Sequence, residues 1–160
     1  FIVFYIAYAF RQVSKPVASW KYGLSAIIAL THDILIVMGI FAVLGHVANV
    51  EVDTLFVTAL LTILGFSIHD TIVTFDRTRE NLFRTHDKSF DEIVNLSVNQ
   101  TIVRSINTSV TTLFVLFAIY VFGGDNIRFF VLALMLGVII GTYSSIFVAS
   151  PLLSIWNKKS

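Results

Sequence analysis

Several ionisable residues lie inside long apolar segments, where charge is costly and is usually retained for function. They are two His-Asp pairs, His32-Asp33 and His69-Asp70, and one arginine, Arg104. Asp70 and Arg104 lie near the same end of successive segments, so their depths permit a contact between neighbouring helices. Burial favours a neutral carboxyl and a nearby arginine favours a charged one, so such a pair can take up and release a proton in turn. The sequence therefore predicts Asp70 and Arg104 as an ion-coupling pair, with a static ion pair that only fixes packing as the alternative.

Hydroxyl side chains surround both members of this pair in the sequence. They can hydrate an ion path, or they can hydrogen-bond between helices and hold the bundle together. The residues that we expect to support the coupling pair are Asp33, His32, His69, Thr71, Thr74, Ser105 and Thr108.

Other chemistries find no support in these residues. Adjacent residues on a helix point about 100° apart, so each His-Asp dipeptide is a poor metal chelate. Asp70 follows Ser-Ile-His and Asp33 follows Leu-Thr-His, so the Gly-x-Gly-Asp motif of intramembrane aspartyl proteases is missing. Cysteine is absent, and no phosphate-binding loop or nucleophile motif is visible. We predict no metal site, no cofactor other than a coupling ion, and no enzyme activity.

The elements that carry these residues are membrane spans. Of 160 residues, 56% are hydrophobic and 13% are charged, with mean hydropathy +0.85, whereas soluble domains carry about a quarter charged residues. The net charge of +1 argues against a nucleic-acid partner. We predict a single all-α transmembrane domain, in which residues 1–10 end an earlier span and four full spans cover 22–45, 54–76, 105–122 and 127–150.

The charged residues between the spans predict the orientation of the chain. Nine of the 11 basic residues lie in 11–21, in 77–100 and at the C-terminus. The loops 46–53 and 123–126 carry acids instead. This positive-inside pattern predicts that the C-terminus is cytoplasmic.

A polar stretch precedes the third full span and contains a helix start signal. Ser89 and Glu92 form an S-x-x-E capping box, and Phe90, Ile93 and Val94 fall on one face. We therefore predict a helix over 89–100 that lies on the cytoplasmic membrane surface and leads into the span at 105. A docking site for a partner is the alternative.

Small residues recur every four positions along the last span, which is typical of helices that approach each other closely. The residues of this stripe are Ala133, Gly137, Gly141, Ser145 and Ala149. The stripe predicts helix packing at Gly137, Gly141 and Ser145 without indicating the partner helix.

Four stretches of the chain resemble the SecF subunit of the bacterial SecDF protein-export complex. They are ALTHD (29–33), GFSIHDTIVTFDRTREN (65–81), NLSVNQTIVRSINTS (95–109) and GTYSSIFVASPLL (141–153). The resemblance covers nearly the whole chain and corresponds to the end of the second through the sixth transmembrane helix of that subunit. It implies a bundle of the resistance–nodulation–division type, half of a pseudo-symmetric assembly of 12 helices.

The resemblance also implies a function in the bacterial cytoplasmic membrane. SecDF uses a proton or sodium gradient to assist preprotein export, so the implied partners are SecD, the SecYEG channel with SecA, the preprotein and lipids. The family's coupling aspartate falls on Asp70 and its coupling arginine on Arg104. His69 stands where the family commonly has asparagine, and Thr74 and Thr78 stand where it often has aliphatic residues. The alternatives are a proton-coupled exporter of small molecules or lipids, and a scaffold that transports nothing.

Overall fold

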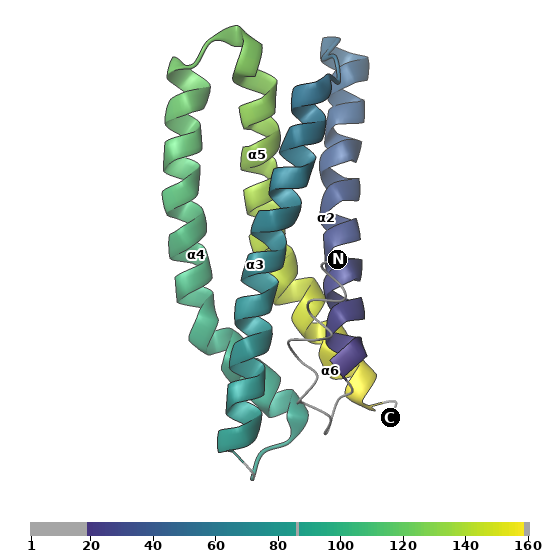
Figure 1. Ribbon diagram of the computed structural model, residues 1–160, viewed down its shortest axis with the longest axis vertical. Helices are drawn as coiled ribbons and strands as arrows, with labels where there is room; N and C mark the ends of the chain where they lie inside the picture. The colour runs from purple at the N-terminus through teal and green to yellow at the C-terminus, as the bar shows by residue number, and fades with distance from the viewer. Residues whose placement is uncertain (1–18, 86, 159–160) are drawn as a thin grey trace.

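The computed structural model describes residues 19–85 and 87–158, and this part of the chain is helical (Figure 1). Its elements are α2 (Ser19–Ala48), α3 (Thr54–Arg84), α4 (Phe90–Phe122), α5 (Asp125–Ser144), a π-helical turn η1 (Ser145–Ala149) and α6 (Ser150–Lys158). The predicted span over residues 1–10 lies outside the described residues.

The expectation of a bundle of long apolar helices is confirmed. Four helical stretches are long and apolar enough to cross a membrane: Trp20–Ala48, Thr54–Arg84, Phe90–Phe122 and Asp125–Trp156. They contain 29 to 33 residues, or about 44 to 50 Å of helix, so each exceeds the ~30 Å hydrocarbon core. The last stretch combines α5, η1 and α6.

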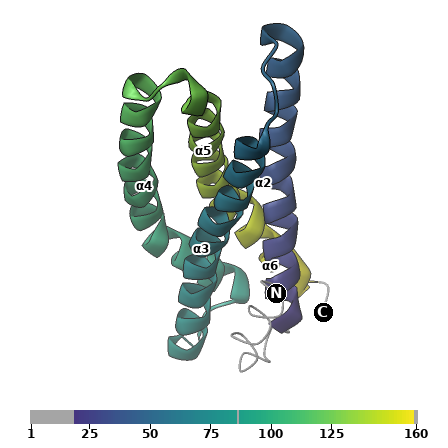
Figure 2. The same cartoon turned by 45° about the horizontal axis from the view of Figure 1, so that its top comes forward.

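Helix α3 lies at the centre of the bundle and contacts α2, α4 and α5. Figures 1 and 2 show α4 at the side of the bundle opposite α2. In the most apolar stretch of α4 only 11% of residues are buried, against 44% in the Asp125–Trp156 span. Most of α4 therefore faces outward from the described bundle.

The two ends of the bundle differ in charge. The α3–α4 connection and α6 lie at one end, and the α2–α3 and α4–α5 connections lie at the other (Figure 1). We call the first the basic end, because it carries Lys21, Arg77, Arg79, Arg84 and Lys88. The opposite end is called the far end below.

The capping box predicted at the start of α4 is present. The Ser89 hydroxyl accepts a bond from the Glu92 backbone N–H, and the Glu92 carboxylate accepts from the Ser89 N–H at 2.8 Å. Asp53 caps α3 in a similar way, because its Oδ1 accepts from the Phe56 N–H at 2.9 Å.

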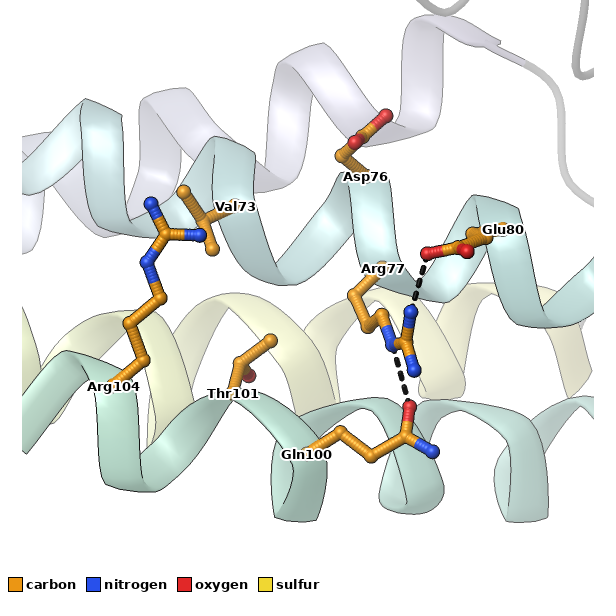
Figure 3. Close-up of a pocket in the computed structure, with 7 residues that line it drawn as sticks. All are labelled: Val73, Asp76, Arg77, Glu80, Gln100, Thr101 and Arg104. Atoms are coloured by element: carbon orange, nitrogen blue, oxygen red, sulfur yellow. Dashed lines mark hydrogen bonds and ion pairs between the residues drawn. The ribbon is translucent and has the colours of Figure 1, made fainter.

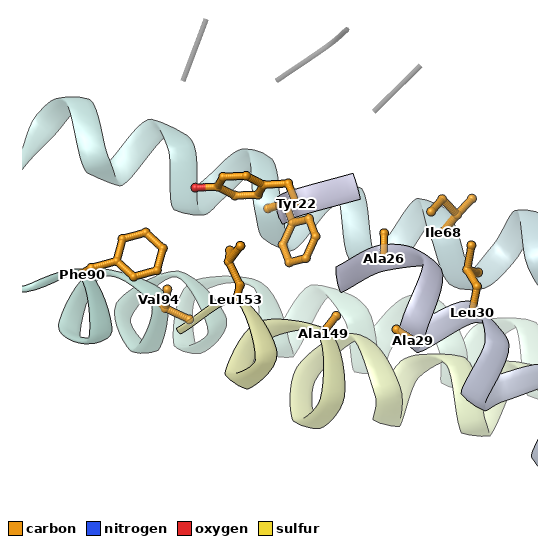
Figure 4. Packing of buried hydrophobic residues seen from close by; sticks show 10 residues of the cluster. Tyr22, Ala26, Ala29, Leu30, Ile68, Phe90, Val94, Ala149 and Leu153 are labelled. Carbon is orange, nitrogen blue, oxygen red and sulfur yellow. The ribbon is translucent and has the colours of Figure 1, made fainter. Parts of the chain in front are cut away.

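The helix predicted over 89–100 is present as the first turns of α4, which run at an angle to the upper part of that helix (Figure 1). Phe90–Phe122 is one continuous helix, because no glycine or proline interrupts it between Phe90 and the span. The apolar face of its first turns packs on protein, since Phe90 and Val94 join a cluster with Tyr22 and Leu153 (Figure 4). The apolar face of these first turns is therefore covered by protein, and their place on the membrane surface stays a prediction.

The small-residue stripe of α5 packs against α3. A Cβ atom placed on Gly137 would lie 2.7 Å from Ile63 Cγ2 and nearer still to Ile63 Cγ1 and Cδ1. A Cβ on Gly141 would lie 3.0 Å from Ser67 Cβ. The partner helix that the sequence left open is therefore α3, and both glycines are needed for its close approach.

Candidate functional site

A layer of buried polar side chains separates two apolar clusters. The cluster near the basic end includes Leu30, Ile68 and Ala149, and the cluster near the far end includes Val37 and Ile63. Between them lie the buried polar residues Asp33 on α2, Ser67, Asp70 and Thr71 on α3, Ser144 at the end of α5, and Ser145 at the start of η1. We call this group the polar layer.

Asp70 is 9% exposed and is held by hydroxyls from two other elements. Ser105 of α4 donates to its Oδ1 at 2.6 Å. Ser145 at the start of η1 donates to its Oδ2 at 2.8 Å. The carboxyl therefore ties α3 to both α4 and η1.

The expected ion pair between Asp70 and Arg104 is absent from the described part of the chain. The cause is the helical geometry, because adjacent residues point about 100° apart. Ser105 faces α3 and bonds Asp70, whereas the exposed Arg104 extends beside Val73 at the border of a cavity between α3 and α4 (Figure 3). Depth along the helix was compatible with a contact, but the rotational position of Arg104 prevents it in this conformation.

Arg104 borders a polar cavity of about 330 Å³ between α3 and α4, near the basic end (Figure 3). Arg77 crosses this cavity, with its Nε donating to Gln100 Oε1 at 2.6 Å and its Nη1 pairing with Glu80 at 2.5 Å. The full lining is Val73, Asp76, Arg77, Glu80, Gln100, Thr101 and Arg104. The cavity thus places charged side chains that water can reach near the polar layer.

Hydroxyl groups continue from the polar layer toward that cavity. The Thr74 hydroxyl donates to the Asp70 carbonyl at 3.3 Å and lies 3.5 Å from the Thr101 hydroxyl. Thr101 lines the cavity. The α3–α4 contact therefore offers a run of two hydroxyls between the Asp70 backbone carbonyl, not its carboxyl, and the cavity.

Asp33 is fully buried and has surroundings like those of Asp70. Its Oδ2 accepts from Ser67 at 2.5 Å and from Ser144 at 2.7 Å. His32 Nδ1 lies 3.1 Å from Oδ1 of Asp33. Each aspartate of the two His-Asp dipeptides thus accepts two serine hydroxyls from two different elements.

The other predicted residues are placed differently. His69 is exposed and points away from the bonds that hold Asp70, whereas Thr71 is buried in the polar layer. Thr108 is exposed, and its hydroxyl donates to the Arg104 carbonyl at 3.0 Å. Within residues 19–85 and 87–158, no three His, Asp or Glu side chains come close enough to hold a metal ion.

Sequence reasoning missed Ser144 as a site residue and treated Ser145 as a packing residue. The available signal was the Ser144-Ser145 dipeptide inside an apolar span, six residues before Pro151. Two adjacent serines point in different directions, so each can serve a different carboxyl. The π-helical turn that begins at Ser145 has no simple sequence signature.

Comparison with known proteins identifies the family. The model for the family "protein export membrane protein SecD/SecF, C-terminal" matches residues 1–159. The chain belongs to the SecD/SecF family. Members of this family are protein-export membrane proteins.

Curated SecF proteins are similar over most of this SecD/SecF chain. It is 60% identical over 158 residues to the protein translocase subunit SecF of Thermobaculum terrenum, covering 99% of this chain and 49% of the relative. It is 55% identical over 137 residues to SecF of Synechocystis sp., covering 86% and 44%. The chain therefore spans about half the length of the curated relatives it matches.

Two solved structures of SecDF share the fold. The crystal structure of SecDF in a super-membrane-facing form matches with TM-score 0.87 and 39% identity, over 98% of this chain and 20% of that one. SecDF from Thermus thermophilus, a translocon-associated membrane protein, matches with TM-score 0.86 and 40% identity over the same shares. The helices of this family member thus have the arrangement of SecDF helices.

Proposed function

We propose that this chain is the membrane-embedded part of a SecF subunit that couples an H⁺ or Na⁺ gradient to preprotein export across the bacterial cytoplasmic membrane. Similarity to export proteins supports the family setting. The observation that carries the coupling role is Asp70, a buried carboxyl inside a spanning helix whose side-chain partners are hydroxyls. Ionisable residues at such positions usually lie on ion pathways.

The chemistry of the partners favours proton exchange at Asp70. A serine hydroxyl has one donor and two acceptor sites and rotates freely. Ser105 and Ser145 can therefore donate to an ionised Asp70, and either one can instead accept a bond from a protonated Asp70. An arginine or a backbone N–H would serve only the ionised form. The site thus keeps its hydrogen bonds in both protonation states.

Arg104 supplies the second state of the proposed cycle. In the conformation described above it lies apart from Asp70 and borders the polar cavity. Rotation or sliding of α4 toward α3 would exchange the Ser105 bond for an ion pair with Arg104, and would stabilise the ionised carboxylate. A gradient that loads and unloads Asp70 would then drive α4 between two positions relative to α3.

The exposed face of α4 supports SecD as the partner in this cycle. Arg104, Asn107, Thr108 and Thr111 are spaced as one helical face, and all four are exposed in the isolated chain. A polar face at membrane depth is unfavourable in lipid and is suited to another protein. We propose that the membrane half of SecD covers it and completes a 12-helix assembly of the resistance–nodulation–division type. SecYEG with SecA, the preprotein and lipids are the further partners proposed, with the C-terminus in the cytoplasm.

The test replaces the two charged residues in the full-length subunit, co-reconstituted with SecD, SecYEG and SecA. We expect Asp70→Asn and Arg104→Met each to abolish the gradient-dependent part of preprotein export while the ATP-dependent part persists. Asp125→Asn, an exposed acid at the far end, is the matched control and should be silent. Wild-type gradient dependence in Asp70→Asn would refute the proposal.

A scaffold that transports nothing makes a different prediction. If the charges only stabilised the bundle, apolar residues at both positions would leave gradient-dependent export intact, since apolar swaps of buried charges are often tolerated. Under the coupling proposal, the double replacement Asp70→Leu, Arg104→Leu is as inactive as either single variant. Retained export by the double variant would establish the scaffold.

A further inference from the structure

Asp33 is a second buried carboxyl that the cycle described above does not use. It is fully buried in the middle of α2, and its Oδ2 accepts two serine hydroxyls, from Ser67 and Ser144. A carboxyl without a cationic guanidinium or ammonium partner is costly to keep ionised inside a membrane domain. Ser67 and Ser144, like the serines around Asp70, can donate to the ionised form or accept from the protonated form.

Two covalent links connect the surroundings of Asp33 to those of Asp70. The adjacent residues Ser144 and Ser145 each hold one carboxyl, with Ser144 on Asp33 and Ser145 on Asp70. On α3, Ser67 lies three residues before Asp70, or about 4.5 Å along the helix axis. The two carboxyls and the three serines therefore form a closed ring across α2, α3 and the α5–η1 junction.

This ring closes at an irregular point of the helix. The π-helical turn η1 begins at Ser145, whose carbonyl accepts a bond from the Ser150 hydroxyl at 2.9 Å. A π turn holds one more residue than an α turn and is often found at functional sites. A change in the bond between Ser144 and Asp33 is thus transmitted to the backbone of the residue that holds Asp70.

The ionisable groups around Asp33 are few. On its own helix His32 contacts it, at 3.1 Å. On α3 the charged group of the ring is Asp70, with His69 turned outward and exposed. From α5 and η1 the groups that reach it are hydroxyls, because Asp125 and Arg128 lie at the far end and Tyr143 is exposed. An ionised Asp33 therefore opposes ionisation of Asp70 through the ring.

We propose that Asp33 is a second proton-binding residue, and that its protonation state controls proton binding at Asp70 through the Ser144-Ser145 link. The inference rests on the proposed function, because it takes Asp70 as the coupling residue. Asp33 acts as a positioning residue: its ionised form accepts the Ser144 and Ser67 hydroxyls, and its neutral form donates to one of them, so that this hydroxyl must turn and give its own proton to another acceptor. The π turn is the element that changes between two arrangements when Asp33 gains or loses its proton.

The primary test is infrared spectroscopy of the full-length subunit with SecD in proteoliposomes, with ¹³C-labelled aspartate carboxyls, over a pH titration. We expect two buried carboxyl signals in the wild type. Asp33→Asn should remove one and move the midpoint of the Asp70 signal to lower pH, because a neighbouring negative charge is lost. An Asp70 midpoint unchanged in Asp33→Asn, or no carboxyl signal lost, would overturn the proposal.

Two further variants separate coupling from folding. Ser144→Ala keeps both carboxyls but cuts the link, so it should move the Asp70 midpoint by less than Asp33→Asn does. Thr31→Val, which removes an exposed hydroxyl of α2 that only donates to the Ile27 carbonyl, is the control and should leave it unchanged. If Asp33→Asn fails to fold, Ser144→Ala decides alone, and an unmoved midpoint overturns the proposal.

This readout does not depend on export. If Asp70→Asn retains gradient-dependent export, the proposed function fails, while the infrared titration still reports whether the two carboxyls interact. If Asp70→Asn loses export but Asp33→Asn leaves both the titration and the pH profile of export unchanged, only the further inference fails.

Discussion

Gly137 gives the sharpest test of the α3–α5 packing. A methyl group added there would lie 2.7 Å from Ile63 Cγ2 and nearer to two further Ile63 carbons, whereas carbon atoms pack at about 3.5–4.0 Å. These carbons are attached close to the α3 backbone, and Ile63 is 1% exposed, so its side chain has no free space to enter. Overpacking of this kind costs about 1–3 kcal/mol.

The cost must be separated from helix propensity, which favours alanine over glycine by about 1 kcal/mol. Gly65 on α3 is the matched control, because a methyl group there meets nothing within 4 Å. We expect the free energy of unfolding of Gly137→Ala to be about 1–3 kcal/mol below that of Gly65→Ala. The measurement is unfolding of the purified subunit with its partner in mixed micelles.

Ile63→Ala completes the experiment as a double-mutant cycle. It removes all three clashing carbons at a cost of its own, so Gly137→Ala in that background should behave like Gly65→Ala. The coupling free energy should equal the overpacking cost, about 1–3 kcal/mol. Equal effects of Gly137→Ala in both backgrounds would refute the inference that α3 is the partner of the stripe.

Three further predictions use the same stability measurement. Phe75→Ala should lower the free energy of unfolding by about 3–5 kcal/mol, because this ring is 1% exposed and packs edge-on against Tyr22. Phe114→Ala is the control and should cost far less, because that side chain is 71% exposed. Equal losses in the two variants would contradict the packing. Asp53→Ala should cost about 0.5–2 kcal/mol by removing the α3 cap, and Asp53→Asn should restore most of it. Ser105→Ala should destabilise the domain by about 1–3 kcal/mol by leaving one oxygen of a buried carboxyl unsatisfied, and a silent variant would argue against that bond.

Hydropathy and helix signals were sufficient to predict the main elements. Long apolar runs can satisfy their backbone groups in lipid only as helices, and the Ser89–Glu92 capping box located the start of α4 correctly. These signals do not show which parts of the folded protein pack against the segment that precedes the third full span. The sequence does not reveal that Tyr22 and Leu153 cover Phe90 and Val94.

The candidate site was predicted in part for a similar reason. The position of Asp70 along its helix follows from counting residues, and so does its depth relative to Arg104. Which residue of α4 faces α3 depends on the rotation of the helix, and here Ser105 takes that place. The joint use of Ser144 and Ser145 depends on the π turn, which arises from packing across the bundle and not from local propensity.

The exposure of α4 bears on how the protein is assembled in the cell. Arg104 and Asn107 are both exposed on α4, and charged or polar side chains inside a span are costly in lipid. A subunit synthesised without its partner would hold this helix loosely and present polar groups to lipid. We therefore expect the two halves of the complex to depend on balanced synthesis, with surplus copies of either one short-lived.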